Sequence, residues 1–195
     1  IFEGEELGLK NVRFDHLNQY NDLETKNIFS ELTNQHHESP EAAMEAIYLH
    51  SRDNARTPMP WDGSQKGGFT TGKPWLELNP DHQQINAEKD LADSDGVYHY
   101  YQRLIKLRHE EPLVTTGDFE LLAPDDPDLF IYLRRGKNET LLVAGNFSES
   151  QRRWPLPDAL QNKQVTTLIS NVPIAKRVGK IITLPPFGSV VYKLQ

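Results

Sequence analysis

The sequence predicts an α+β chain in two parts, a helix-and-loop region over residues 1–112 and an antiparallel β-sandwich over residues 113–195. Apolar residues recur with the 3.6-residue period of helices before Pro112 and with the two-residue period of strands after it. The strand-like runs are short, lie between turn clusters and have no helix among them, which is typical of a sandwich.

The chain opens on Ile1-Phe2, which we interpret as the last residues of a strand, so we expect this sequence to be part of a longer protein. A helix is then predicted from Asp22 to about Thr33. Its apolar side consists of Leu23, Ile28, Phe29 and Leu32.

A second helix is marked by its first residues. Ser39 suits the N-cap, Pro40 the first helical position, and Glu41 the positive end of the helix dipole. The apolar stripe of this helix consists of Ala43, Met44, Ile47 and Tyr48.

Residues 51–90 contain so many glycines and prolines that a long loop is expected rather than a regular element. Loops of this length inside compact proteins are usually functional or disordered. Trp61, Phe69 and Trp75 favour order, because aromatic side chains usually bury large areas.

The third predicted helix is capped by Ser94 and ended by Pro112. Its stripe consists of Val97, Tyr98, Tyr101, Leu104, Ile105 and Arg108. Strands are then expected at residues 119–122, 129–133, 140–147, 165–169, 181–184 and 190–194.

The composition excludes several classes of protein. With 21 basic and 28 acidic residues the net charge is -7, so a nucleic-acid partner is not expected. No apolar run is long enough to span a bilayer, so no membrane role is expected. The absence of cysteine excludes disulfides and thiolate metal sites and fits a cytoplasmic protein.

The segment of residues 51–62 is the strongest candidate for chemistry. Arg52 and Arg56 are four residues apart with Asp53 and Asn54 between them, and arginine can grip carboxylates or hydroxyl groups. The alternative is a structural network of ion pairs. His36-His37 has no matching metal-ligand pattern, so we interpret it as an exposed loop and expect no metal site.

Other side chains carry weaker signals. Acidic residues that could serve in acid–base chemistry, although a solvated or capping role is commoner, are Glu5, Glu6, Asp22 and Glu24. Tryptophans that could stack on ligands, although core packing is the commoner use, are Trp61, Trp75 and Trp154.

Colinear segments along nearly the whole chain resemble one family, the oligo-1,6-glucosidases and related α-glucosidases of the α-amylase superfamily (glycoside hydrolase family 13). The resemblance is carried by residues 1–8, 22–27, 52–62, 68–75, 85–86, 100–108, 141–147 and 184–187. Glu3 and Pro60 depart from the more usual glutamines of the family.

The resemblance implies that residues 1–112 are the last strand–helix portion of a (β/α)8 TIM barrel and that residues 113–195 are its C-terminal β-sandwich domain. It implies retaining hydrolysis of a terminal α-glucosidic bond, without a cofactor. The family's catalytic nucleophile, acid/base and third carboxylate have no counterpart here, so no catalytic residue is expected in this chain.

What the resemblance leaves to this chain is contact with the substrate, a small oligosaccharide. Arg52 is similar to the arginine that meets the non-reducing glucose, and Arg56 to a brace of the same loop. Glu24 and Asn27 match residues that face the next sugar. These positions belong to the C-terminal face of the barrel, where such enzymes bind substrates.

Two further interpretations remain open. Trehalose-6-phosphate hydrolases share the pattern but often have serine where Ala55 stands, which favours the 1,6-glucosidases slightly. A non-catalytic module that packs on a barrel or binds glucan is the alternative from another class. Exposed apolar helix faces are expected in the first region, because their partner strands would lie elsewhere.

Overall fold

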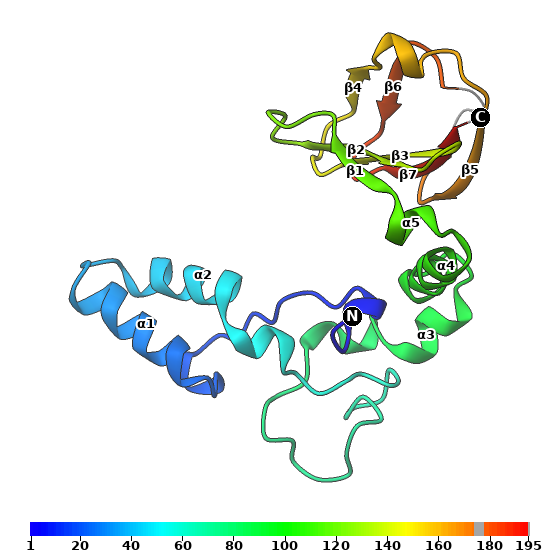
Figure 1. Ribbon diagram of the computed structural model, residues 1–195. Coiled ribbons are helices and arrows are strands. Elements are labelled where there is room, and N and C mark those ends of the chain that lie inside the picture. The colour runs from blue at the N-terminus through cyan, green and yellow to red at the C-terminus, as the bar shows by residue number, and fades with distance from the viewer. Residues whose placement is uncertain (174–177, 195) are drawn as a thin grey trace. The chain divides into compact units, whose positions relative to one another are not determined.

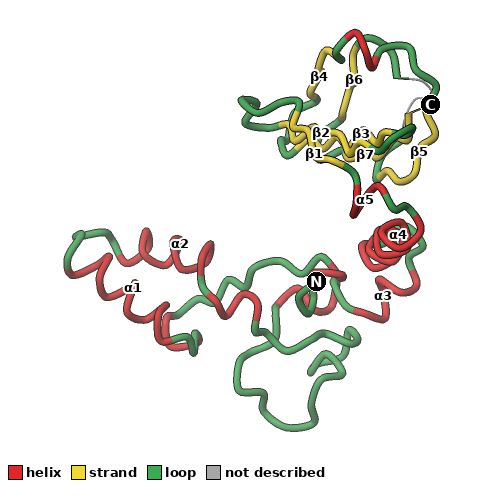
Figure 2. Tube along the Cα trace, in the orientation of Figure 1, coloured by secondary structure: helices red, strands yellow, loops and turns green. Residues whose placement is uncertain are grey.

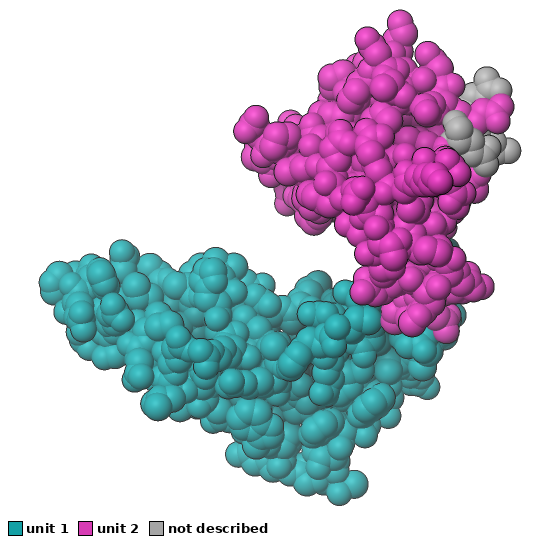
Figure 3. Space-filling view, viewed as in Figure 1, with its two compact units in different colours: residues 1–101 teal, residues 102–195 magenta. Residues whose placement is uncertain are grey.

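The computed structural model describes residues 1–173 and 178–194. They form two compact units, Ile1–Tyr101 and Gln102–Gln195 (Figure 3). The change from one unit to the other falls inside helix α4 (Val97–Glu110). The division at residue 112 proposed from the sequence stays a prediction.

In the first unit α1 (Leu23–Asn34) and α2 (Pro40–His50) pack side by side (Figure 1). Both begin at side-chain caps: the carboxylate of Asp22 and the hydroxyl of Ser39 each accept the backbone N–H three residues on. The predicted start of the second helix is therefore confirmed, with Pro40 at its first turn.

The expected apolar side of α1 is buried only in part. Phe29 packs against a core formed mainly by the segment before α1 and by α2, whereas Leu23 and Ile28 are 71% and 40% exposed. The reason is that, among the described helices and strands, α1 packs mainly against α2. This small core consists of Val12, Phe14, Tyr20, Ile47 and Leu76.

The segment predicted as one long loop contains short helices, so that expectation is partly wrong. Asn86 caps α3 (Ala87–Ala92) by accepting the N–H of Lys89, a start signal that the sequence analysis passed over. The short 3-10 helices of the chain are η1 Glu5–Leu7, η2 Leu17–Gln19, η3 Arg52–Ala55, η4 Pro80–Gln83 and η5 Asp158–Leu160. The remainder of the segment is loop (Figure 2).

Two predicted details at element ends are wrong. Ile1-Phe2 is not strand, because no strand pairs with it among the described residues. Ser94 is not the N-cap of α4, which begins at Val97; the N–H groups of Val97 and Tyr98 donate to Asp90 at 3.1 and 2.6 Å. The end of α3 therefore caps α4.

α4 contains no buried residue, and Val97, Leu104 and Ile105 of its apolar stripe are 36–44% exposed. This confirms the expected exposure of apolar helix faces. No described helix is both long enough and apolar enough to cross a membrane.

The second unit is an antiparallel β domain that follows a one-turn helix, α5 (Leu113–Thr116). One sheet has the strand order β1-β2-β3-β7-β5 and the other pairs β4 with β6. The strands are β1 Asp118–Leu121, β2 Leu129–Arg135, β3 Thr140–Asn146, β4 Arg152–Pro155, β5 Val165–Ser170, β6 Ile181–Leu184 and β7 Ser189–Leu194. All described pairs are antiparallel, as predicted.

The two-residue period places alternate side chains of the large sheet in one core. β2 buries Leu129, Ile131 and Leu133, and Ile182 and Leu184 of β6 join them from the second sheet. β4 was missed because its four residues, two of them arginine and one proline, carry little strand signal; the strand is defined by its pairing with β6.

Candidate functional site

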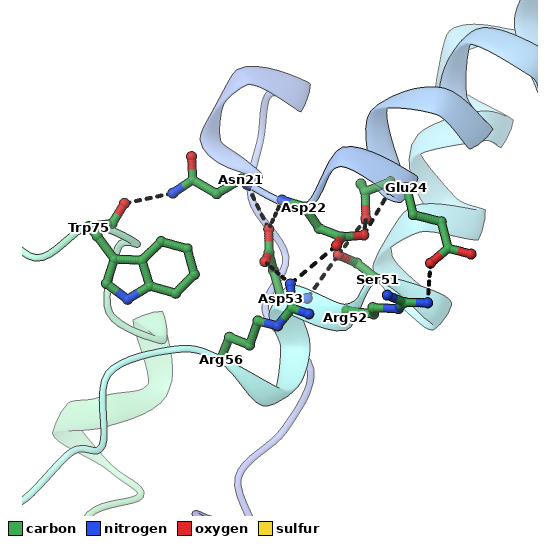
Figure 4. A network of polar contacts seen from close by, with 9 residues as sticks. Asn21, Asp22, Glu24, Ser51, Arg52, Asp53, Arg56 and Trp75 are labelled. Carbon is green, nitrogen blue, oxygen red and sulfur yellow. Dashed lines mark hydrogen bonds and ion pairs between the residues drawn. The ribbon is translucent and has the colours of Figure 1, made fainter.

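A buried carboxylate joins the candidate loop to the start of α1 (Figure 4). Asp53 in η3 is fully buried, and its Oδ2 accepts the backbone N–H groups of Asn21 at 2.6 Å and Asp22 at 2.9 Å. Two donors on one oxygen offset part of the cost of burying this side chain. The segment that carries Arg52 is thereby tied to the segment that leads into α1.

Arg56 closes the network from the solvent side. Its Nη1 lies 3.2 Å from Oδ1 of Asp22 and 3.7 Å from Oδ1 of Asp53, an oxygen with no hydrogen-bond partner among the described residues. The Arg56 side chain is 42% exposed, while the side chains of Asp22 and Asp53 are buried. One cation therefore balances two acidic groups.

Asp22 is the second buried carboxylate of this network. Its Oδ2 accepts the backbone N–H and the hydroxyl of Thr25, each at 3.0 Å, and that hydroxyl also lies 2.9 Å from Oγ of Ser51. Burial by itself would raise the pKa of Asp22. The hydrogen bonds from Thr25 and the charge of Arg56 outweigh it, so the pKa lies below its ordinary value of 3.8.

This depressed pKa makes the first unit sensitive to acid. The stabilisation that Asp22 provides is present above the pKa of an unfolded aspartate, about 3.9, and is lost as pH falls through the lower folded pKa. Asp22→Asn, which keeps a capping oxygen, should flatten this loss below about pH 4. Urea unfolding between acidic and neutral pH, followed by tryptophan fluorescence in a Trp154→Phe background, measures it.

The matched control for this experiment is Glu120→Gln. Hydrogen bonding to Arg135 lowers the pKa of Glu120, but this pair lies on β1 and β2 of the second unit. Its removal should leave the acid response of the first unit unchanged. An identical acid response in wild type and Asp22→Asn would show that Asp22 does not control it.

The network presents one exposed ion pair. Nη2 of Arg52 lies 2.5 Å from Oε2 of Glu24, and the two side chains are 62% and 51% exposed. Asn27 stands three residues after Glu24 and is also exposed. Beside the pair lies a pocket of about 260 Å³ with Ile28 and His50 in its lining.

The structure thus brings Arg52, Glu24 and Arg56 into one network and places Asn27 one helical turn from it. Each carboxylate of the network is engaged: Asp53 by backbone N–H groups, Asp22 by its cap, and Glu24 by Arg52. Such an arrangement can orient a polar ligand. It leaves none of these three carboxylates poised as a nucleophile.

Comparison with known proteins identifies the fold. Residues 1–117 match the family described as alpha amylase, catalytic domain, and residues 119–191 match the maltogenic amylase C-terminal domain. The chain belongs to the α-amylase family. Both parts of the architecture, the end of a catalytic barrel and an antiparallel C-terminal domain, follow from this membership and agree with the observed elements.

Among curated relatives, the oligo-1,6-glucosidase of Parageobacillus thermoglucosidasius is 42% identical over the whole chain. The trehalose-6-phosphate hydrolase of Bacillus subtilis is 38% identical, also over the whole chain. The chain spans 35% of the length of each of these two relatives.

Solved structures of the α-amylase family have the same fold. Trehalose-6-phosphate hydrolase of Bacillus licheniformis superposes with a TM-score of 0.91 at 38% identity, and trehalulose synthase from Pseudomonas mesoacidophila with 0.89 at 39%. Each match covers the whole of this chain and 35% of the other.

Some features of the site differ from the sequence analysis. Trp61 and Trp75 are 55% and 62% exposed, so their expected core packing is wrong, whereas Trp154 packs against the β-domain core. Hydrogen bonds such as that from the N–H of Trp61 to the carbonyl of Gly67 order the loop instead. The role of Asp53 was missed, although its place between two arginines was a usable signal.

Proposed function

We propose that this chain is the C-terminal, substrate-side part of a retaining glycoside hydrolase that removes glucose from terminal α-1,6-glucosidic bonds of isomalto-oligosaccharides. The observation that supports it most is the exposed ion pair between Arg52 and Glu24. The loop that carries Arg52 is held to the start of α1 by the buried carboxylate of Asp53. This arrangement occurs in a chain that resembles oligo-1,6-glucosidases over its full length.

In this proposal Arg52 donates hydrogen bonds to hydroxyls of the non-reducing glucose. Glu24 accepts from hydroxyls of the next sugar, and Asn27 adds an amide beside it. Arg56 holds the loop through Asp22 and Asp53. The geometry is suited to orientation, the part of catalysis that holds the bond to be cleaved in a reactive position.

The chemical step belongs, in this proposal, to carboxylates outside the chain. Retaining hydrolysis needs a carboxylate nucleophile and a carboxylic acid about 5–5.5 Å apart on either side of the glycosidic bond. The proposal includes no metal, organic cofactor or nucleic-acid partner, and a cytoplasmic location.

A second candidate is hydrolysis of trehalose 6-phosphate, which the 38% identity to two trehalose-6-phosphate hydrolases favours. The experiment that separates the two gives isomaltose, panose and trehalose 6-phosphate to the longer protein that carries this chain. Glucose release from isomaltose and panose supports the first candidate, and release from trehalose 6-phosphate alone supports the second. Release from none of them contradicts both and favours a non-catalytic module.

A further inference from the structure

Two buried residues with hydroxyl groups are the sequence neighbours of the exposed ion pair. Thr25 follows Glu24 in the first turn of α1, and Ser51 directly precedes Arg52. Both side chains are buried, and their hydroxyl oxygens lie 2.9 Å apart. Each charged side chain of the ion pair therefore extends from the residue next to one member of a buried hydroxyl pair.

The hydrogen bonds of this hydroxyl pair run in one direction. The carboxylate of Asp22 is ionised at neutral pH and can only accept, so the hydroxyl of Thr25 donates its single proton to Oδ2 of Asp22 at 3.0 Å. The hydroxyl of Ser51 must then donate to Oγ1 of Thr25, while its own oxygen accepts the backbone N–H of Asp53 at 3.2 Å. The series ends at a charged acceptor, and successive hydrogen bonds of this kind strengthen one another.

The hydroxyl pair joins the start of η3 to the first turn of α1. An ion pair between long, exposed side chains is weak, so it does not by itself fix the distance between the segments that carry it. The Asp53 carboxylate holds the residues that precede α1, whereas the hydroxyl pair reaches the helical residue next to Glu24. Figure 4 shows Ser51 on the same side of Asp53 as the ion pair. Thr25 and Ser51 also line the pocket of about 260 Å³ beside that pair.

We propose that Thr25 and Ser51 are positioning residues whose hydroxyl pair sets the separation of their charged neighbours, and thereby the fit of a substrate that contacts both. That Arg52 and Glu24 meet two successive sugars rests on the proposed function, whereas the control of their separation does not. The expected consequence is selective. A substrate of two sugars depends on this separation, and an aryl α-glucoside, which has one sugar, does not.

The first test measures the ion pair in this chain without a substrate. The Nε–H signal of Arg52 is followed by nuclear magnetic resonance, and the shift that Glu24→Gln causes in it reports contact between the two side chains. In a Thr25→Val background, which keeps the shape of threonine without its hydroxyl, this shift should fall to about half or less. Thr33→Val is the matched control, because the hydroxyl of Thr33 donates to the carbonyl of Phe29 within α1 at 2.8 Å, and it should leave the shift unchanged. An undiminished shift in Thr25→Val would overturn the proposal.

The second test compares two substrates in the longer protein. We expect Thr25→Val to lower kcat/KM for isomaltose about tenfold and that for an aryl α-glucoside by less than about twofold. Thr25→Ser, which keeps the hydroxyl, should stay close to wild type. Equal losses on both substrates in Thr25→Val would indicate a packing role and contradict the proposal.

Ser51→Ala removes the other hydroxyl and serves also where Thr25→Val fails to fold. It should give the same selective loss and the same smaller shift of the Arg52 signal. The double variant should lose no more activity than the more affected single variant, because both changes break one contact, and additive losses would contradict the pair. If wild type cleaves neither substrate while the Arg52 signal responds as expected, the proposed function fails and the positioning role stands.

Discussion

Replacing Arg52 with alanine in the longer protein should lower kcat/KM for isomaltose about a hundredfold. Hydrogen bonds that involve a charged group contribute about 1.5–3 kcal/mol, and each 1.4 kcal/mol changes the rate constant about tenfold. The side chain of Arg52 is exposed and pairs with Glu24, and it makes no contact in the buried part of the network. The loss should therefore appear in activity, with little change in unfolding temperature.

Two variants make this result specific. Arg52→Lys keeps the charge but loses the planar, two-pronged donor, so an intermediate loss of about tenfold is expected. Arg13→Ala removes another exposed arginine of the first unit, which pairs with Glu45, and should leave kcat/KM unchanged. Full activity in Arg52→Ala would remove the central residue of the proposed function.

Replacing Asp53 with alanine should destabilise the first unit by about 3 kcal/mol. The backbone N–H groups of Asn21 and Asp22 would lose their shared acceptor, and an unsatisfied buried donor costs about 1–3 kcal/mol. Arg56 would also lose one of its two anionic neighbours. Urea unfolding of the chain, read from Trp61 and Trp75 in the Trp154→Phe background, measures the loss.

Asp53→Asn tests the mechanism, because its carbonyl oxygen can still accept both N–H groups. It should cost clearly less than Asp53→Ala, although its amide then faces Arg56. Asp81→Ala is the matched control: Asp81 is 44% exposed and pairs with Lys10 at 3.5 Å, so its removal should change stability by less than about 1 kcal/mol. Equal losses of stability in Asp53→Ala and Asp81→Ala would contradict the stabilising role of the buried Asp53 carboxylate.

The sequence predicted those features that depend on local signals. The cap at Ser39, the helices on either side of it and the antiparallel strands follow from side chains close to each element. Features that depend on distant partners were missed. β4 exists because β6 pairs with it, and α4 begins where Asp90 from α3 accepts its first N–H groups.

In the candidate site too, features with a local sequence signal were predicted and contacts between distant residues were not. The pattern of two arginines around Asp53 and Asn54 singled out this loop, and the resemblance implied that Glu24 faces the next sugar. The ion pair between Arg52 and Glu24 was not predicted and comes from the structure. The burial of Asp53 and its bonds to Asn21 and Asp22 join residues more than 30 positions apart. No local pattern encodes such a contact.

The central claim is that this chain orients a substrate whose cleavage is carried out by carboxylates outside it. Adding an aryl α-glucoside to the purified chain, with the longer protein alongside, tests this claim most directly. We expect release of the aryl group from the longer protein only. Turnover by the chain alone would contradict the account and would make Glu5, Glu6 and Glu24 the first residues to replace.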